Sequence, residues 1–176
     1  MTTTTSSGLT FRQFMRKMFR RKLVLAGVIV LGVVTLLALI APAVSTYNPM
    51  ELKILDRLIS PDATHWFGTD EFGRDIFTRV IYGGRYSLSI GALVVVISVL
   101  GGTLFGLLAG FFRRLDGPIM RVVDAMMSFP DILLAIALVA VLGASMLNVV
   151  LALAIVYVPR VARVVRSSTL VVRELL

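Results

Sequence analysis

Long uncharged runs alternate with short polar stretches along this chain. Residues 23–44 form a run of 22 residues without a charge, and residues 88–112 form a second run of 25. As a helix rising about 1.5 Å per residue, either run is long enough to cross the roughly 30 Å hydrocarbon core of a bilayer. The pattern therefore predicts transmembrane helices at about 23–44 and 88–112.

A third uncharged region, residues 132–159, is either one long span or the core of two short ones. A single span would place the arginines that follow it on the outer side, against the bias of positive charge toward the cytoplasm. Two spans, at about 121–143 and 146–162, place them inside, and we favour this interpretation. Three residues supply the turn between the spans: Gly143, Ser145 and Asn148. The arginines concerned are Arg160, Arg163, Arg166 and Arg173.

The predicted third span contains two acids and a proline. Acids within the membrane are costly and often functional, and Pro130 is expected to kink the helix. We interpret Asp124 and Asp131 as structural residues near the cytoplasmic interface, with Ser128 and Asp131 capping a helix that restarts at the kink. A substrate or proton site is the alternative.

The N-terminal 22 residues combine a Thr/Ser-rich start with a basic, aromatic-containing segment that has no acid. This composition predicts a tail on an anionic cytoplasmic leaflet. Ala41-Pro42-Ala43 imitates a signal-peptide cleavage site, but signal-peptide apolar cores are only about 7–15 residues long. We therefore expect a retained first helix with a cytoplasmic N-terminus.

The segment between the first two spans ends in HWFGTDEFGRDIFTRVIYGGRYSLSIG, residues 65–91. Its first half has turn chemistry, in which Thr69 and Asp70 can accept backbone N–H bonds, and Asp70 and Arg74 have the i, i+4 spacing of an ion pair. Residues 75–82 have an apolar side and a polar side, which predicts a short interfacial helix. Gly83 and Gly84 are expected to break that helix. The predicted organisation is a tail (1–22), a first helix (23–44), an extracytoplasmic segment (45–87) and a membrane core (88–176).

Small residues recur every fourth position in the second span. Such a ridge lets another helix approach closely, and we expect it to form a packing seam within this chain or with a partner. The ridge consists of Ser98, Gly102, Gly106 and Gly110. A cytoplasmic turn is predicted at residues 116–118, Asp-Gly-Pro.

Composition supports a membrane protein and argues against several other classes. Hydrophobic residues make up 57% of the chain, against about 45–50% in soluble domains. The net charge of +8 comes from residues at the ends of apolar runs, so topology explains it better than nucleic-acid binding. The chain has no Cys and one His, and it lacks the P-loop, zinc-protease and nucleophile-elbow motifs. No catalytic residue, metal site or cofactor is predicted.

Residues 65–91 also resemble a segment of the permease subunits of dipeptide, oligopeptide and nickel ABC importers. The resemblance is carried by His65, Gly68, Thr69, Asp70, Gly73, Arg74, Asp75, Arg79, Tyr82, Gly83, Arg85, Ser87, Leu88 and Gly91. It continues through Asp124, Phe129-Pro130, Asn148, Pro159, Arg160, Arg163 and Arg166, and it is nearest to the second, C-type permease.

The resemblance implies an all-α, multi-pass permease of the bacterial inner membrane that translocates peptides or similar small solutes. It implies four kinds of partner: membrane lipid, a second permease, two cytoplasmic ATPases that hydrolyse the ATP, and an extracytoplasmic solute-binding protein. In such permeases a Glu-Ala-Ala loop that docks on the ATPase follows Arg163, and we expect the present sequence to stop before it. A non-transporting membrane scaffold or an inactive fragment is the alternative interpretation. The solute is not specified by the sequence.

Overall fold

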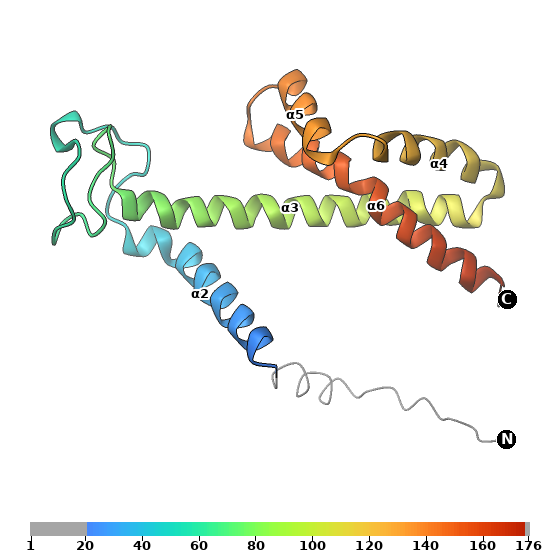
Figure 1. Cartoon of the computed structure of the whole chain (residues 1–176), viewed down its shortest axis with the longest axis horizontal. Coiled ribbons are helices and arrows are strands. Elements are labelled where there is room, and N and C mark those ends of the chain that lie inside the picture. Colours follow the sequence, from blue (N-terminus) through green and yellow to red (C-terminus); the bar gives the residue numbers. More distant parts are fainter. Residues whose placement is uncertain (1–20, 175–176) are drawn as a thin grey trace. The chain divides into compact units, whose positions relative to one another are not determined.

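The computed structural model describes residues 21–174, which form helices joined by one long connecting segment (Figure 1). The elements are α2 (Lys22–Val44), the short 3₁₀ helix η1 (Ile54–Asp56), α3 (Ile76–Phe111), α4 (Arg113–Met127), α5 (Asp131–Leu142) and α6 (Met146–Glu174). The described residues contain no β-strand beyond an isolated bridge between Thr69 and Asp75. The predicted all-α class is confirmed. Most of the predicted basic tail, residues 1–20, lies outside the described part of the chain.

Three helices in residues 21–174 are long and apolar enough to cross a membrane: α2, α3 and α6. The α4–α5 pair would form a fourth crossing, although its two helices are bent by 95° relative to each other. This agrees with the predicted four-span class, with a third span that is broken into two helices.

The chain divides into two compact units at Tyr86 and Ser87. The first unit contains α2, the connecting segment (residues 45–75) and the first turns of α3. The second contains the rest of α3 together with α4, α5 and α6.

Helix α3 is longer than predicted, because it begins at Ile76 and passes through Gly83 and Gly84 without a break. The prediction that these two glycines end an interfacial helix is wrong. A glycine costs a helix only about 1 kcal/mol relative to alanine, and the uncharged run that follows favours continuation, since backbone groups in lipid must bond within the helix.

The chain turns at Phe112 and not, as predicted, at residues 116–118. Phe112 has an extended backbone (φ −101°, ψ 100°), and α4 starts directly after it. Pro118 lies inside α4, where its missing N–H removes one helix hydrogen bond. Helix α4 is amphipathic, with Val123 buried and its charged residues on the exposed side, which is why it does not continue α3 as a span.

Helix α4 ends at Met127, and the chain changes direction across residues 128–130. Pro130 has no N–H and disfavours a helical conformation in the residue before it. The predicted capping of α5 by Ser128 and Asp131 is wrong: the Ser128 hydroxyl donates to the carbonyl of Ala125 in α4 at 2.6 Å, and α5 has no side-chain cap.

Helix α6 continues well beyond the predicted end at residue 162 and reaches Glu174. Within the second unit, α6 and α3 run in the same direction. The Ser98 hydroxyl donates to the Ala154 carbonyl at 3.3 Å, and further along both helices Gly110 lies against Thr169. Because α3 and α6 run in the same direction, the chain must come back from the end of α3 to the start of α6. Helices α4 and α5 form this return segment, which runs alongside them (Figure 1).

Candidate functional site

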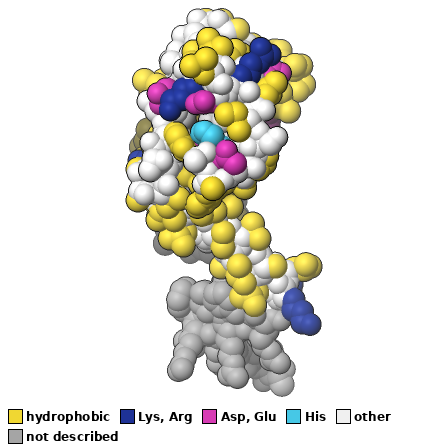
Figure 2. All heavy atoms as spheres, turned by 90° about the vertical axis from the view of Figure 1, so that its left-hand side faces the viewer, with side chains coloured by type: hydrophobic (Ala, Val, Ile, Leu, Met, Phe, Trp, Pro, Cys, Tyr) yellow, Lys and Arg dark blue, Asp and Glu magenta, His cyan; other side chains and the backbone are white. Residues whose placement is uncertain are grey.

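The motif residues of the connecting segment gather around two carboxylates, those of Asp70 and Asp75. Both side chains are largely buried, although the segment carries charged and apolar side chains side by side on its surface (Figure 2). Buried carboxylates need hydrogen-bond or ionic partners, and each of these two has several.

Asp70 fixes the tight turn that precedes α3. One carboxylate oxygen accepts the N–H groups of Phe72 (2.8 Å) and Arg74 (3.0 Å). The other accepts Nε of Arg74 at 2.9 Å and also the guanidinium of Arg79. The predicted i, i+4 pair is thus present, but it closes a turn and does not lie on a helical face.

The pKa of Asp70 reflects these contacts. Burial opposes ionisation, but the N–H groups of Arg74 and Phe72 and the Arg74 guanidinium outweigh it and lower the pKa from 3.8 to about 2. The carboxylate is therefore charged at neutral pH and holds its donors in place.

Asp75 joins the connecting segment to α3. One oxygen accepts the N–H of Thr78 at 2.7 Å, which is the usual N-cap interaction and stabilises the helix start. The other lies 3.0 Å from Nδ1 of His65, whose ring stacks on Tyr47 with centroids 4.9 Å apart. Burial alone would raise the pKa of Asp75, but the bonds from Thr78 and His65 lower it. The sequence analysis did not predict this buried acidic partner of His65.

The two motif glycines that precede these carboxylates are required by geometry. Gly68 and Gly73 have φ values of +72° and +71°, which side chains rarely adopt. A Cβ on Gly68 would collide with the Ile59 carbonyl, and one on Gly73 with the Lys53 carbonyl.

Thr69 holds the backbone between Gly68 and Gly73 in place. Its buried hydroxyl accepts the N–H of Ile59 at 2.8 Å and donates to the carbonyl of Asp56. Two further motif residues, Tyr82 and Arg85, lie on α3; among the described residues neither side chain has a hydrogen bond or ion pair.

The small-residue ridge of α3 faces α6 of the same chain. A Cβ added to Gly106 would lie 2.7 Å from the Ala162 carbonyl, and one on Gly110 would lie 2.6 Å from Cβ of Thr169. Gly102 meets Val161 in the same way. The absence of side chains at these positions lets the two helices approach at backbone distance.

Three arginines along one stripe of α6 pair with three aspartates on α4 and α5. The pairs, named as the ion-pair ladder from here on, are Arg160–Asp131, Arg163–Asp124 and Arg166–Asp116. The last pair uses two guanidinium nitrogens, one of which donates to the second carboxylate oxygen at 2.6 Å, and it is the least exposed of the three.

The ion-pair ladder was not predicted from the sequence. The sequence analysis assigned these arginines to a basic cytoplasmic face, and Asp124 and Asp131 to the membrane interface. One signal was available. Between residues 88 and 173 the chain has only three acids, Asp116, Asp124 and Asp131, and each pairs with an arginine of α6. Their order is reversed relative to the arginines, as expected for a return segment packed antiparallel to α6.

Two family models match the chain. Residues 10–61 match the N-terminal transmembrane domain of oligopeptide transport permease C. Residues 102–175 match the binding-protein-dependent transport system inner membrane component.

Curated relatives match across almost the whole chain. The dipeptide transport system permease protein DppC of Alkalihalophilus pseudofirmus is 44% identical over 165 residues, covering 93% of this chain and 54% of the relative. The probable D,D-dipeptide transport system permease protein DdpC of Escherichia coli is 40% identical over 153 residues, covering 86% of this chain and 51% of the relative.

A third relative, the glutathione transport system permease protein GsiD of Pectobacterium atrosepticum, is 40% identical over 167 residues, covering 94% of this chain and 56% of the relative. The chain thus spans about half the length of the curated relatives it matches. These relatives are transport permeases and not enzymes, and their family is embedded in the inner membrane with several spans. The chain belongs to the family of inner-membrane permease subunits of peptide ABC importers, in its C-type branch.

Proposed function

We propose that this chain forms part of the translocation path of a bacterial ABC importer for short peptides or similar small solutes. It would work with a second permease, two cytoplasmic ATPases and an extracytoplasmic solute-binding protein, and ATP would be hydrolysed on the ATPases. The observation that carries the proposal is the 44% identity to a dipeptide permease across 93% of this chain. The named solutes of the relatives, which are dipeptides, D,D-dipeptides and glutathione, all have peptide-like bonds and charges.

We infer an orientation with the N-terminus in the cytoplasm and the connecting segment outside, within the organisation 1–22, 23–44, 45–87 and 88–176. Positive charge favours the cytoplasmic side. The parallel order of α3 and α6 supports this orientation, because it gathers the arginines at the start of α4 and Arg173 at one end of the second unit. Arg173 donates to the Gly110 carbonyl at 3.0 Å, so these two helix ends lie level.

The contacts of the second unit suggest how it would move during transport. The seam holds α3 against α6, and the ion-pair ladder holds α4 and α5 against α6. A unit fastened on two sides moves as one body, as expected when ATPase closure reorients helices around a central path. No covalent chemistry is required of its residues.

Uptake by the full gene product tests the proposal. The gene is expressed together with genes for a second permease, the ATPases and a solute-binding protein of such an importer in cells that lack peptide importers, and uptake of a radiolabelled dipeptide is measured. We expect ATP-dependent uptake that disappears when the ATPase P-loop lysine is replaced. Normal membrane assembly of all subunits without uptake of any short peptide would favour a non-transporting scaffold.

A further inference from the structure

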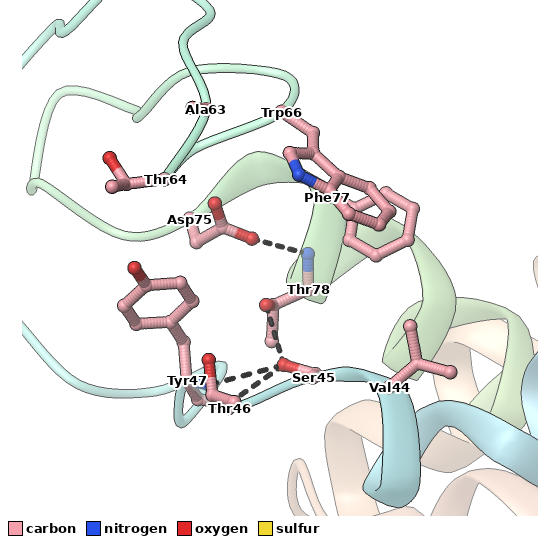
Figure 3. Close-up of a pocket in the computed structure, with 10 residues that line it drawn as sticks. All are labelled: Val44, Ser45, Thr46, Tyr47, Ala63, Thr64, Trp66, Asp75, Phe77 and Thr78. Atoms are coloured by element: carbon pink, nitrogen blue, oxygen red, sulfur yellow. Dashed lines mark hydrogen bonds between the residues drawn. The ribbon is translucent and has the colours of Figure 1, made fainter.

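A cavity of about 320 Å³ lies beside the start of α3, entirely within the first unit (Figure 3). Its walls come from the end of α2, the residues that follow it, the loop around residue 64 and the first turn of α3. This volume is at the lower end of the range of about 300–1,000 Å³ seen for small-ligand sites. None of the motif contacts described above explains why the space is there.

The cavity is lined by acceptors and aromatic rings. Figure 3 shows Trp66 and Phe77 next to each other, and their ring centroids lie 4.9 Å apart. Hydroxyl groups, the Asp75 carboxylate and two small apolar side chains, those of Val44 and Ala63, line the rest of the wall. None of the ten lining side chains is Lys or Arg. The wall therefore has negative charge and ring faces but no cation of its own.

The Asp75 carboxylate has acceptor capacity left. A carboxylate offers about four lone-pair sites, and the described contacts, from the Thr78 N–H and from His65, occupy two of them. His65 does not line the cavity. The Asp75 carboxylate thus has partners on the side away from the cavity and at the start of α3, but no cation on the cavity side.

We propose that this cavity binds a primary ammonium group, with Asp75 as its counter-ion and Trp66 and Phe77 providing ring faces. An ammonium has three donors, which suit a carboxylate flanked by hydroxyls, and cations are attracted to aromatic faces. Two sources share this chemistry: the amino terminus of a short peptide and the headgroup of an ethanolamine lipid. The lipid headgroup can reach the cavity because the cavity lies where α2 ends and α3 begins, and both are long and apolar enough to cross a membrane. The proposal rests on the cavity itself and not on the transport function.

Trp66 is the only tryptophan in the chain, so its fluorescence reports directly on the cavity. The full chain is reconstituted in phosphatidylcholine nanodiscs and titrated with Ala-Ala, with N-acetyl-Ala-Ala, and with glycerophosphoethanolamine. We expect a saturable change in emission with a ligand that has a primary ammonium and none with the acetylated peptide. Nanodiscs containing phosphatidylethanolamine distinguish the sources, because an occupied cavity would change the starting emission and weaken the Ala-Ala response.

Substitutions test the assigned residues. Asp75→Asn keeps an N-cap residue but removes the charge, and we expect the affinity to fall about tenfold or more, the usual effect of losing a charged hydrogen bond. Asp56→Asn removes the same charge from the same segment outside the cavity and should leave binding unchanged. Phe77→Leu, which keeps the carboxylate, should weaken binding roughly two- to fivefold. The proposal is overturned if no primary amine changes the emission, if acetylation makes no difference, or if Asp75→Asn and Phe77→Leu both bind like the parent.

Discussion

The connecting segment and the second helical unit are stabilised in opposite ways. In the connecting segment, charged and polar groups are buried around Asp70 and Asp75, whereas large apolar side chains such as Ile54 and Leu55 are exposed, the latter completely. In the second unit, the apolar run of α3 packs through its smallest residues, and charge is confined to one stripe of ion pairs.

This difference follows from the surroundings of each region. A segment of some thirty residues without a regular core can hold a single conformation only if its buried backbone groups find partners, and short-range side-chain bonds supply them. Apolar burial offers little to helices surrounded by lipid, so close packing and polar contacts decide their association. The residues that matter are therefore close together in sequence in the first region and far apart in the second.

The largest effect is expected from filling the seam. Gly106→Leu places a side chain where even a Cβ would lie 2.7 Å from the Ala162 carbonyl, and we expect a loss of about 3 kcal/mol or more in stability. Gly91→Leu is the matched control on the same helix, because a Cβ there meets nothing within 4 Å. Thermal unfolding in detergent measures both. Equal melting temperatures would show that the seam does not hold α3 and α6 together.

The ion-pair ladder should give the next largest effect. Arg166→Asp leaves Asp116 facing a like charge, and we expect a loss of about 2 kcal/mol for this half-buried pair. The exchanged double variant, Arg166→Asp with Asp116→Arg, should recover much of that loss in the same assay. The more exposed pair Arg163–Asp124 should contribute about 0–1 kcal/mol. A double variant no more stable than either single one would argue against direct pairing.

Two glycine substitutions give a smaller contrast, between the connecting segment and helix α3. Gly73→Ala imposes a side chain at φ +71° against the Lys53 carbonyl, and we expect a cost of about 1–3 kcal/mol confined to the connecting segment. Gly83→Ala lies inside α3 with open space around it and should be neutral or stabilising by up to about 1 kcal/mol. Hydrogen exchange of residues 53–75 measures the local effect. Faster exchange in both variants, or in neither, would contradict this account.

The smallest effect on stability is expected when the pH is lowered. Because the pKa of Asp70 is lowered from 3.8 to about 2 in the folded segment, its contribution to stability is complete above pH 4 and is lost as the pH falls from about 4 toward 2. Trp66 emission should follow this loss. Asp70→Asn should reduce the transition but not remove it, since the pKa of Asp75 is also lowered in the folded segment. An unchanged acid transition would exclude Asp70 as its cause.

The features that the sequence could predict are those that depend on residues close together in the chain. The apolar runs predicted α2 and most of α3, and the dense motif around residues 65–85 indicated the family. The Asp70–Arg74 spacing predicted a contact that is present. These signals are local, so they can be recognised in a single sequence.

The remaining features depend on neighbours that are distant in sequence. The pairing of α6 with α4 and α5 joins residues 29 to 50 positions apart, and no local pattern specifies which arginine meets which aspartate. The extension of α3 through Gly83 and Gly84 depends on helix continuity outweighing local propensity. The break at Phe112 replaced the expected turn at residues 116–118 because Phe112, which has no turn signature, adopts the extended backbone.

The most direct test of the central claim, that α3 and α6 run parallel and that α4 and α5 carry the chain back, is disulfide cross-linking in membranes. The chain has no cysteine, so pairs can be introduced without background. We expect Gly110→Cys with Thr169→Cys, and Ser98→Cys with Ala154→Cys, to cross-link rapidly under mild oxidation. Ser98→Cys with Thr169→Cys should remain reduced. Rapid cross-linking of this last pair, with the first two remaining reduced, would show that the helices run antiparallel and would contradict the account.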